Sequence, residues 1–320
     1  MQAILVNENK QLNWAAVPDP EPSGSEVLIE IHATAVNRAD LLQREGKYPP
    51  PPGWPEWMGL EVAGTVAALG PDCSERWKVG DQVCALLGGG GYAEKVVADE
   101  SLLIPVPTGL SMIEAASVPE VYATAWLNLV HEADLQHGET AFIQAGASGL
   151  GIAAIQIAKF LGAKVVTTVG SDEKAELIRP YGPDIVVNRK TGSLGDAFDQ
   201  NPVHVALDCA GGDALAECLP KMARGGRWVL VATLGGEFAN ISLRPLLKGG
   251  LRLIGSTLRS RTPEMKATIL RDLTERVWPE FETGCVKPSI HAVLPITEAD
   301  AAHDILKRSE NIGKVVLTLR

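Results

Sequence analysis

The sequence is poor in the residues that build disulfide frameworks and structural metal sites. Only five cysteines occur in 320 residues, none of them in a Cys-x-x-Cys pair, and the six histidines show no metal-ligand spacing. An odd number of dispersed cysteines fits a reducing compartment, and structural zinc needs about four clustered thiolates or imidazoles. We therefore expect a cytoplasmic protein without a bound metal.

Long apolar runs and an excess of positive charge are also missing. No stretch of 18 or more apolar residues occurs, and the N-terminus lacks the charged, apolar and cleavable layout of a secretion signal. The formal net charge of -10 argues against nucleic acid or an anionic membrane as the main partner. We expect a soluble chain whose partner is a small molecule.

The second half of the chain alternates strands and helices from about residue 140. With 46% hydrophobic residues, the chain can bury a large core and is long enough for two domains. Near-continuous apolar strands separated by helical stretches predict an α/β fold with a doubly wound parallel sheet. The expected strands are 140–144, 164–169, 184–188, 203–208, 227–232 and 251–255; the expected helices lie near 150–161, 173–181, 193–199, 212–223 and 242–248.

The first 120 residues have a different pattern. The segments 26–36 and 62–68 alternate apolar and polar residues, and glycine and proline separate the short strands, which predicts a mostly antiparallel β unit. The proline run 48–53 is incompatible with a helix or a central strand, so we expect a stiff surface loop there.

The C-terminal segment returns to mixed structure. Residues 263–281 read as one long helix, and Thr297-Glu298-Ala299-Asp300 resembles a capping box that starts a helix through about Lys307. The last strand is expected at 314–319, and this tail could pack back on the N-terminal unit.

A glycine-rich turn joins the first strand and helix of the alternating region. It reads Gln144-Ala145-Gly146-Ala147-Ser148-Gly149-Leu150-Gly151. Such a turn lets backbone N–H groups approach a pyrophosphate, and the helix N-terminus adds favourable partial charge. The spacing is a relative of the dinucleotide fingerprint, with Ser148 at a position that is often glycine. We expect Ser148, Gly149, Leu150 and Gly151 to bind a dinucleotide.

The end of the next strand favours NADPH over NADH. An NAD-specific fold places a carboxylate there, whereas this sequence has Gly170 and Ser171, with Lys174 one turn on. Lys174 and Arg189 could supply positive charge to a 2′-phosphate. The acids at 172–173 could reach a ribose instead, or be first-turn acids of the next helix.

Several motifs along the chain resemble those of a known family and occur in the same order. They are 37–44 with 46–53, then 59–64, 145–151, 256–261 and 311–316. Together they are similar to the zinc-independent NADPH:quinone oxidoreductases of the medium-chain dehydrogenase/reductase superfamily, which are zeta-crystallin-like proteins. The resemblance covers the whole chain, and it is closest to the stress-inducible, tumour-suppressor-regulated subgroup.

The resemblance implies a domain organisation. Residues 1–121 would form a GroES-like β-rich catalytic domain completed by 262–320, and residues 122–261 a Rossmann domain that binds NADPH. It also implies a homodimer, and the apolar segment 250–255 could be a sheet edge that needs cover.

The resemblance also implies roles for individual residues, according to their positions in the shared motifs. Asn37 and Thr124 are expected near the nicotinamide, and Tyr48 at the quinone pocket, so Asn37 and Tyr48 are the candidate catalytic residues. Gly235, Leu258 and Asn311 are expected along the remaining path of the cofactor. The residues also permit plainer roles: Asn37 could only satisfy backbone groups at a strand end, and Tyr48 could only pack its loop.

Two positions differ from the zinc alcohol dehydrogenases of the superfamily. By the resemblance, Arg38 and Leu60 occupy the positions at which those enzymes carry a cysteine and a histidine zinc ligand. Without a Lewis acid, alcohol chemistry loses its usual means of polarising oxygen, whereas a quinone is already a strong electrophile. Positioning of the reactants could then supply most of the catalysis.

The leading hypothesis is therefore a metal-free, NADPH-dependent quinone reductase. An alternative is an enone or enoyl-thioester reductase in which Tyr48 donates the proton. A third hypothesis is an NADPH-binding structural or regulatory protein with little turnover. Arg259 could be a surface charge or a contact to substrate or phosphate.

Overall fold

The computed structural model describes residues 1–319 and divides into two compact units. The first unit comprises Met1–Ala123 together with the C-terminal segment that begins at Arg259, and the second comprises Thr124–Leu258. Within the described residues no helix is long and apolar enough to cross a membrane.

The second unit is built on a six-stranded parallel sheet. The strands are β8 (Thr140–Ile143), β9 (Lys164–Val169), β10 (Ile185–Asn188), β11 (Val205–Asp208), β12 (Arg227–Leu230) and β13 (Arg252–Gly255). Their order across the sheet is β10-β9-β8-β11-β12-β13, and every neighbouring pair is parallel. This is the order of a dinucleotide-binding doubly wound sheet, so the predicted Rossmann fold is confirmed.

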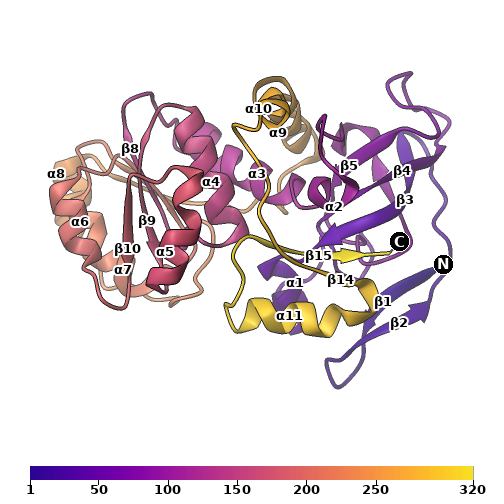
Figure 1. Ribbon diagram of the computed structural model, residues 1–320, viewed down its shortest axis with the longest axis horizontal. Coiled ribbons are helices and arrows are strands. Elements are labelled where there is room, and N and C mark those ends of the chain that lie inside the picture. Colours follow the sequence, from indigo (N-terminus) through magenta and orange to yellow (C-terminus); the bar gives the residue numbers. More distant parts are fainter. Residues whose placement is uncertain (320) are drawn as a thin grey trace. The chain divides into compact units, whose positions relative to one another are not determined.

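Helices cover both faces of this sheet, α4 and α5 on one and α6 and α8 on the other (Figure 1). Because both faces are covered, strands β8 and β11 are buried along their whole length. The helical elements of this unit are the π-helical turn η2 (Leu127–Glu132), α4 (Gly149–Phe160), α5 (Asp172–Ile178), η3 (Arg179–Tyr181), α6 (Leu194–Gln200), α7 (Gly212–Cys218), η4 (Leu219–Lys221) and α8 (Leu243–Gly249).

The first unit holds a seven-stranded sheet and a separate hairpin. The sheet order is β14-β15-β3-β4-β5-β7, with β6 also paired to β3, and the hairpin is β1-β2. The strands are β1 (Gln2–Val6), β2 (Leu12–Ala16), β3 (Glu26–Ala35), β4 (Glu61–Leu69), β5 (Gln82–Leu86), β6 (Lys95–Asp99), β7 (Leu103–Pro105), β14 (Ile290–Pro295) and β15 (Lys314–Thr318).

The C-terminal strand completes this N-terminal sheet. β15 pairs antiparallel with β3 on one side and parallel with β14 on the other (Figure 1). The helical elements of the unit are α1 (Arg38–Arg44), η1 (Glu100–Leu102), α2 (Met112–Ala115), α9 (Pro263–Arg276), α10 (Trp278–Thr283), η5 (Ile296–Glu298) and α11 (Ala299–Lys307); α3 (Pro119–Trp126) runs across the boundary at Ala123.

Two expectations for the C-terminal segment were wrong. The single helix expected over 263–281 is two helices that part at Val277, because Pro279 has no N–H to continue the ladder and its ring crowds the preceding turn. The expected capping box at Thr297 is also absent: a 3₁₀ turn occupies 296–298, and α11 starts at Ala299 without a side-chain cap.

Candidate functional site

The glycine-rich turn of the second unit forms the N-terminus of α4. Ser148 is the N-cap, and its Oγ accepts a hydrogen bond from the Gly151 N–H at 2.9 Å. The N–H groups of Gly149 and Leu150 belong to the first helical turn and have no acceptor within the helix. They remain available to an anion at the carboxyl end of β8.

Two of the glycines are required by packing. A Cβ at Gly146 would lie 2.1 Å from Thr167 Oγ1, and a Cβ at Gly151 would lie 2.3 Å from the Ala145 carbonyl oxygen. Only glycine permits this close approach of turn, helix and neighbouring strand. Ser148, Gly149 and Leu150 remain partly exposed at this turn, at the N-terminus of α4.

A cation lies at the end of β9, where NAD-specific folds carry a carboxylate. A Cβ built on Gly170 would be 3.5 Å from Arg189 Nη2, so the guanidinium lies beside this glycine. Ser171 caps α5 by accepting from the Lys174 N–H at 3.3 Å. Asp172 accepts from Asn188 Nδ2 at 2.8 Å, and the acids at 172–173 are in the first turn of α5.

Gly235 belongs to the same edge of the sheet. Its N–H donates to the Ala210 carbonyl at 2.8 Å, which ties the loop after β12 to the loop after β11. Both loops follow the carboxyl ends of their strands, as does the turn after β8. Of the other expected residues in this unit, Leu258 is buried, and the Thr124 carbonyl accepts from Asn128 Nδ2 at 2.7 Å.

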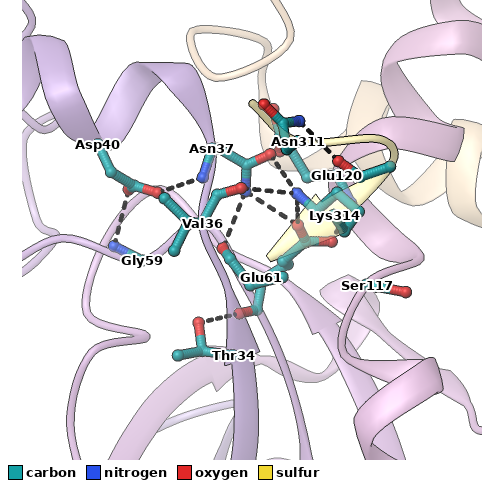
Figure 2. A network of polar contacts seen from close by, with 12 residues as sticks. Thr34, Val36, Asn37, Asp40, Gly59, Glu61, Ser117, Glu120, Asn311 and Lys314 are labelled. Carbon is teal, nitrogen blue, oxygen red and sulfur yellow. Dashed lines mark hydrogen bonds and ion pairs between the residues drawn. The ribbon is translucent and has the colours of Figure 1, made fainter. Parts of the chain in front are cut away.

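In the first unit, Asn37 is at the centre of a polar network (Figure 2). Asn37 is the N-cap of α1, directly after β3. Its Nδ2 donates to Glu61 Oε1 at 2.9 Å and to the Ala35 carbonyl at 3.2 Å, and its Oδ1 accepts from Lys314 Nζ at 2.7 Å. These contacts fix the orientation of the carboxamide.

Glu61 and Lys314 form a buried ion pair at 2.7 Å. They begin β4 and β15, the two strands that flank β3, so the pair spans the end of the strand that leads to Asn37. Lys314 Nζ also donates to the Val36 carbonyl at 3.1 Å, so its three protons all have acceptors. Glu61 Oε2 accepts from the Glu120 N–H at 2.9 Å.

Asp40 supports the network from within α1. Its buried carboxylate accepts from the Asn37 N–H at 2.7 Å, the Gly59 N–H at 3.1 Å and the Tyr92 hydroxyl at 3.3 Å. Burial raises the pKa of Asp40 to about 6, although the two backbone donors oppose the rise. Asp40 therefore closes a capping box at the N-terminus of α1.

Tyr48 lies against a buried arginine. Arg259 donates to the Gly88 carbonyl at 2.7 Å, to the Tyr48 carbonyl at 3.2 Å and to Gln43 Oε1 at 2.7 Å, and its guanidinium carbon is 5.1 Å from the centre of the Tyr48 ring. Arg259 is thus not a surface charge. Burial raises the pKa of the Tyr48 phenol, and the positive charge of Arg259 partly offsets that rise.

Asn311 is in the turn that leads into β15, and its Nδ2 donates to the Gly313 carbonyl at 2.8 Å. Glu61, Lys314 and Glu120 were not among the site residues expected from the sequence. A charged residue at the first position of an apolar strand, as at Glu61 and Lys314, is the signal that could have drawn attention to them.

The described residues 1–319 contain no group of three or more His, Cys, Asp or Glu side chains arranged to hold a metal ion. At the two positions compared with zinc enzymes, Leu60 is buried and Arg38 donates to the Leu306 carbonyl at 2.8 Å.

The ion pair of the first unit yields a stability prediction. Lys314→Met leaves the Glu61 carboxylate buried without its cation, and we expect a loss of about 3–5 kcal/mol of unfolding free energy. The double variant Glu61→Gln/Lys314→Met should lose clearly less, measured by urea denaturation. Lys95→Met, which breaks an exposed pair with Asp19 in the same unit, should cost far less. A Lys314→Met as stable as Lys95→Met would contradict this account.

Two family models match the chain. The alcohol dehydrogenase GroES-like domain matches residues 23–108, and the zinc-binding dehydrogenase model matches residues 149–275. A solved structure described as an NAD-dependent alcohol dehydrogenase has a TM-score of 0.85 at 28% identity, with 100% of both chains covered. The β-rich first unit and the Rossmann second unit therefore have the architecture of the alcohol dehydrogenase superfamily.

Curated relatives of similar length specify the family. Quinone oxidoreductase-like protein 2 of Mus musculus is 32% identical over 100% of this chain and 92% of its own length. Quinone oxidoreductase of Mus musculus is 32% identical over 94% of this chain and 91% of its own length. The chain belongs to the quinone oxidoreductase family of the medium-chain dehydrogenase/reductase superfamily, a family of nicotinamide-dependent oxidoreductases.

Proposed function

We propose that this chain is an NADPH-dependent quinone reductase that works without a metal. The observation that carries the cofactor choice is the Arg189 guanidinium beside Gly170, at the end of β9. A cation there attracts a 2′-phosphate, whereas the carboxylate of an NAD-specific site repels it. The names of the curated relatives support a quinone as the acceptor.

The second unit would hold the cofactor. The first turn of α4, at Ser148, Gly149, Leu150 and Gly151, would bind the pyrophosphate. Gly170, Ser171, Lys174 and Arg189 would surround the 2′-phosphate. The rest of the cofactor would be bound by Thr124, Gly235 and Leu258, with Asn37 and Asn311 from the first unit.

The first unit would hold the acceptor. When bound, reduced nicotinamide supplies a hydride equivalent to the quinone. Asn37 would orient the reactants, because Glu61 and Lys314 fix its carboxamide. Tyr48 would line the quinone pocket, where burial raises the pKa of its phenol.

The residues at the two positions where zinc enzymes carry metal ligands are consistent with metal-free chemistry. The guanidinium of Arg38 is engaged by the Leu306 carbonyl, and Leu60 is an apolar, buried side chain. Neither can ligate zinc. A quinone accepts reducing equivalents without a Lewis acid, because its reduced form is aromatic.

We also propose a homodimer that pairs the β13 edges of two copies. Within residues 1–319, β13 has a neighbouring strand on one side only. Exposed apolar side chains gather in the same part of the chain, with Phe238 89%, Leu247 85% and Leu253 42% exposed. An apolar sheet edge needs cover, and a two-fold axis would provide it to both copies.

The phosphate site can be tested with one substitution. Arg189→Ala should weaken NADPH binding about tenfold to hundredfold, because a charge-assisted contact contributes roughly 1.5–3 kcal/mol. The NADH dissociation constant should hardly change; both are measured by fluorescence titration. Arg179→Ala, which removes an exposed arginine paired with Glu176, is the control and should change neither. Equal losses for both cofactors would reject the phosphate site.

The dimer can be tested by multi-angle light scattering. At micromolar concentration the mass should be twice the 34.0 kDa of one chain. Leu253→Lys, which places a charge on the proposed edge, should shift the mass toward a single chain. A wild-type mass of 34.0 kDa would contradict the dimer.

A further inference from the structure

Glu120 is the member of the Asn37 network that the proposed function leaves unused. It lies in the first turn of α3, and its backbone N–H donates to Glu61 Oε2 at 2.9 Å (Figure 2). Its side chain is partly exposed, and within residues 1–319 its carboxyl makes no hydrogen bond. A carboxyl group is thus held beside the network with its oxygens free.

The protons of the groups around Asn37 are engaged in hydrogen bonds. The three protons of Lys314 Nζ go to Val36, Asn37 and Glu61, and both protons of the Asn37 amide go to Glu61 and Ala35. Glu61 only accepts hydrogen bonds. Within residues 1–319, Glu120 is therefore the acidic member of this network whose carboxyl oxygens accept no hydrogen bond.

Glu120 holds its proton at neutral pH. Burial raises its pKa to about 8, and the negative charge of Glu61 on β4 adds to the rise, with a smaller contribution from Asp40 on α1. Lys314 on β15 and Lys266 on α9 act in the opposite direction. Such a value is suited to a general acid, because the group is mostly protonated at pH 7 and still gives up its proton readily.

Two further groups lie within electrostatic reach of Glu120. Its negative charge, once formed, disfavours ionisation of the Tyr48 phenol and favours the charged form of Arg259. Glu120 and the residue expected at the quinone pocket therefore belong to one electrostatic environment in the first unit.

We propose that Glu120 is the general acid that protonates the reduced quinone. This inference rests on the proposed function. When bound, reduced nicotinamide would supply the quinone with a hydride and its electron pair. The oxygen that gains negative charge then forms an O–H bond with the proton of Glu120, whose own O–H bond breaks and leaves a carboxylate. Solvent restores the proton, so quinone, reduced nicotinamide and one proton give hydroquinone and oxidised nicotinamide.

Two lysines stabilise the Glu120 carboxylate that is left after each proton transfer. Lys314 and Lys266 favour the charged form, and Glu61 disfavours it. Opposed charges of this kind let one carboxyl both lose and regain a proton near neutral pH.

The test compares Glu120→Gln with wild type and with Glu75→Gln, a control that removes the carboxylate of an exposed residue. Glu120→Gln should lower kcat/KM for a para-benzoquinone about hundredfold and leave the NADPH dissociation constant unchanged. Wild-type kcat/KM should fall above about pH 8, and this alkaline limb should vanish in Glu120→Gln. Glu120→Asp should recover part of the rate and keep the limb.

A readout independent of turnover is the carboxyl resonance of Glu120 in ¹³C NMR. One resonance should titrate near pH 8 in wild type and in Glu75→Gln, and should be missing from Glu120→Gln. Unchanged quinone turnover in Glu120→Gln, or no carboxyl that titrates near pH 8, would overturn the role of Glu120 alone. A wild-type protein that binds NADPH but reduces no quinone would instead overturn the proposed function, and this role with it.

Discussion

The Glu61–Lys314 ion pair is the interaction on which the rest of the first unit depends. The two residues are 253 positions apart, yet the pair joins β4 to β15 across the end of β3. A buried pair of this kind contributes little net stability, but losing one partner is costly, so it specifies a single arrangement. That arrangement fixes the carboxamide of Asn37 and the first turn of α3, which carries Glu120.

The fold of the second unit was largely predictable from local sequence. Parallel strands buried on both faces read as apolar runs, and a glycine-rich turn was expected between the first strand and helix. The structure adds a physical reason for two glycines: Gly146 and Gly151 are dictated by contacts to Thr167 and Ala145. The nearness of Arg189 to Gly170 followed from strand order, because β10 is the neighbour of β9.

The polar network was not predictable in the same way. Its members come from β4, α3 and β15, and no local pattern pairs a glutamate with a lysine 253 residues away. The sequence did not decide whether Arg259 is a surface charge or a contact residue. Its guanidinium donates to two backbone carbonyls and an amide oxygen, and such partners leave no pattern of opposite charges in the sequence. The single helix expected over 263–281 was wrong because the prediction gave the surrounding helical pattern more weight than Pro279. Pro279 lacks the N–H that would continue the hydrogen-bond ladder, and the helix therefore breaks.

The central claim is that a metal-free site in this chain reduces quinones with NADPH. Its most direct test is steady-state oxidation of NADPH and NADH by purified, chelator-treated protein with ortho-quinones, para-quinones and enones as acceptors. The account predicts quinone turnover that prefers NADPH and is unchanged by the chelator. Turnover of enones alone, or activity that returns only when zinc is added, would contradict it.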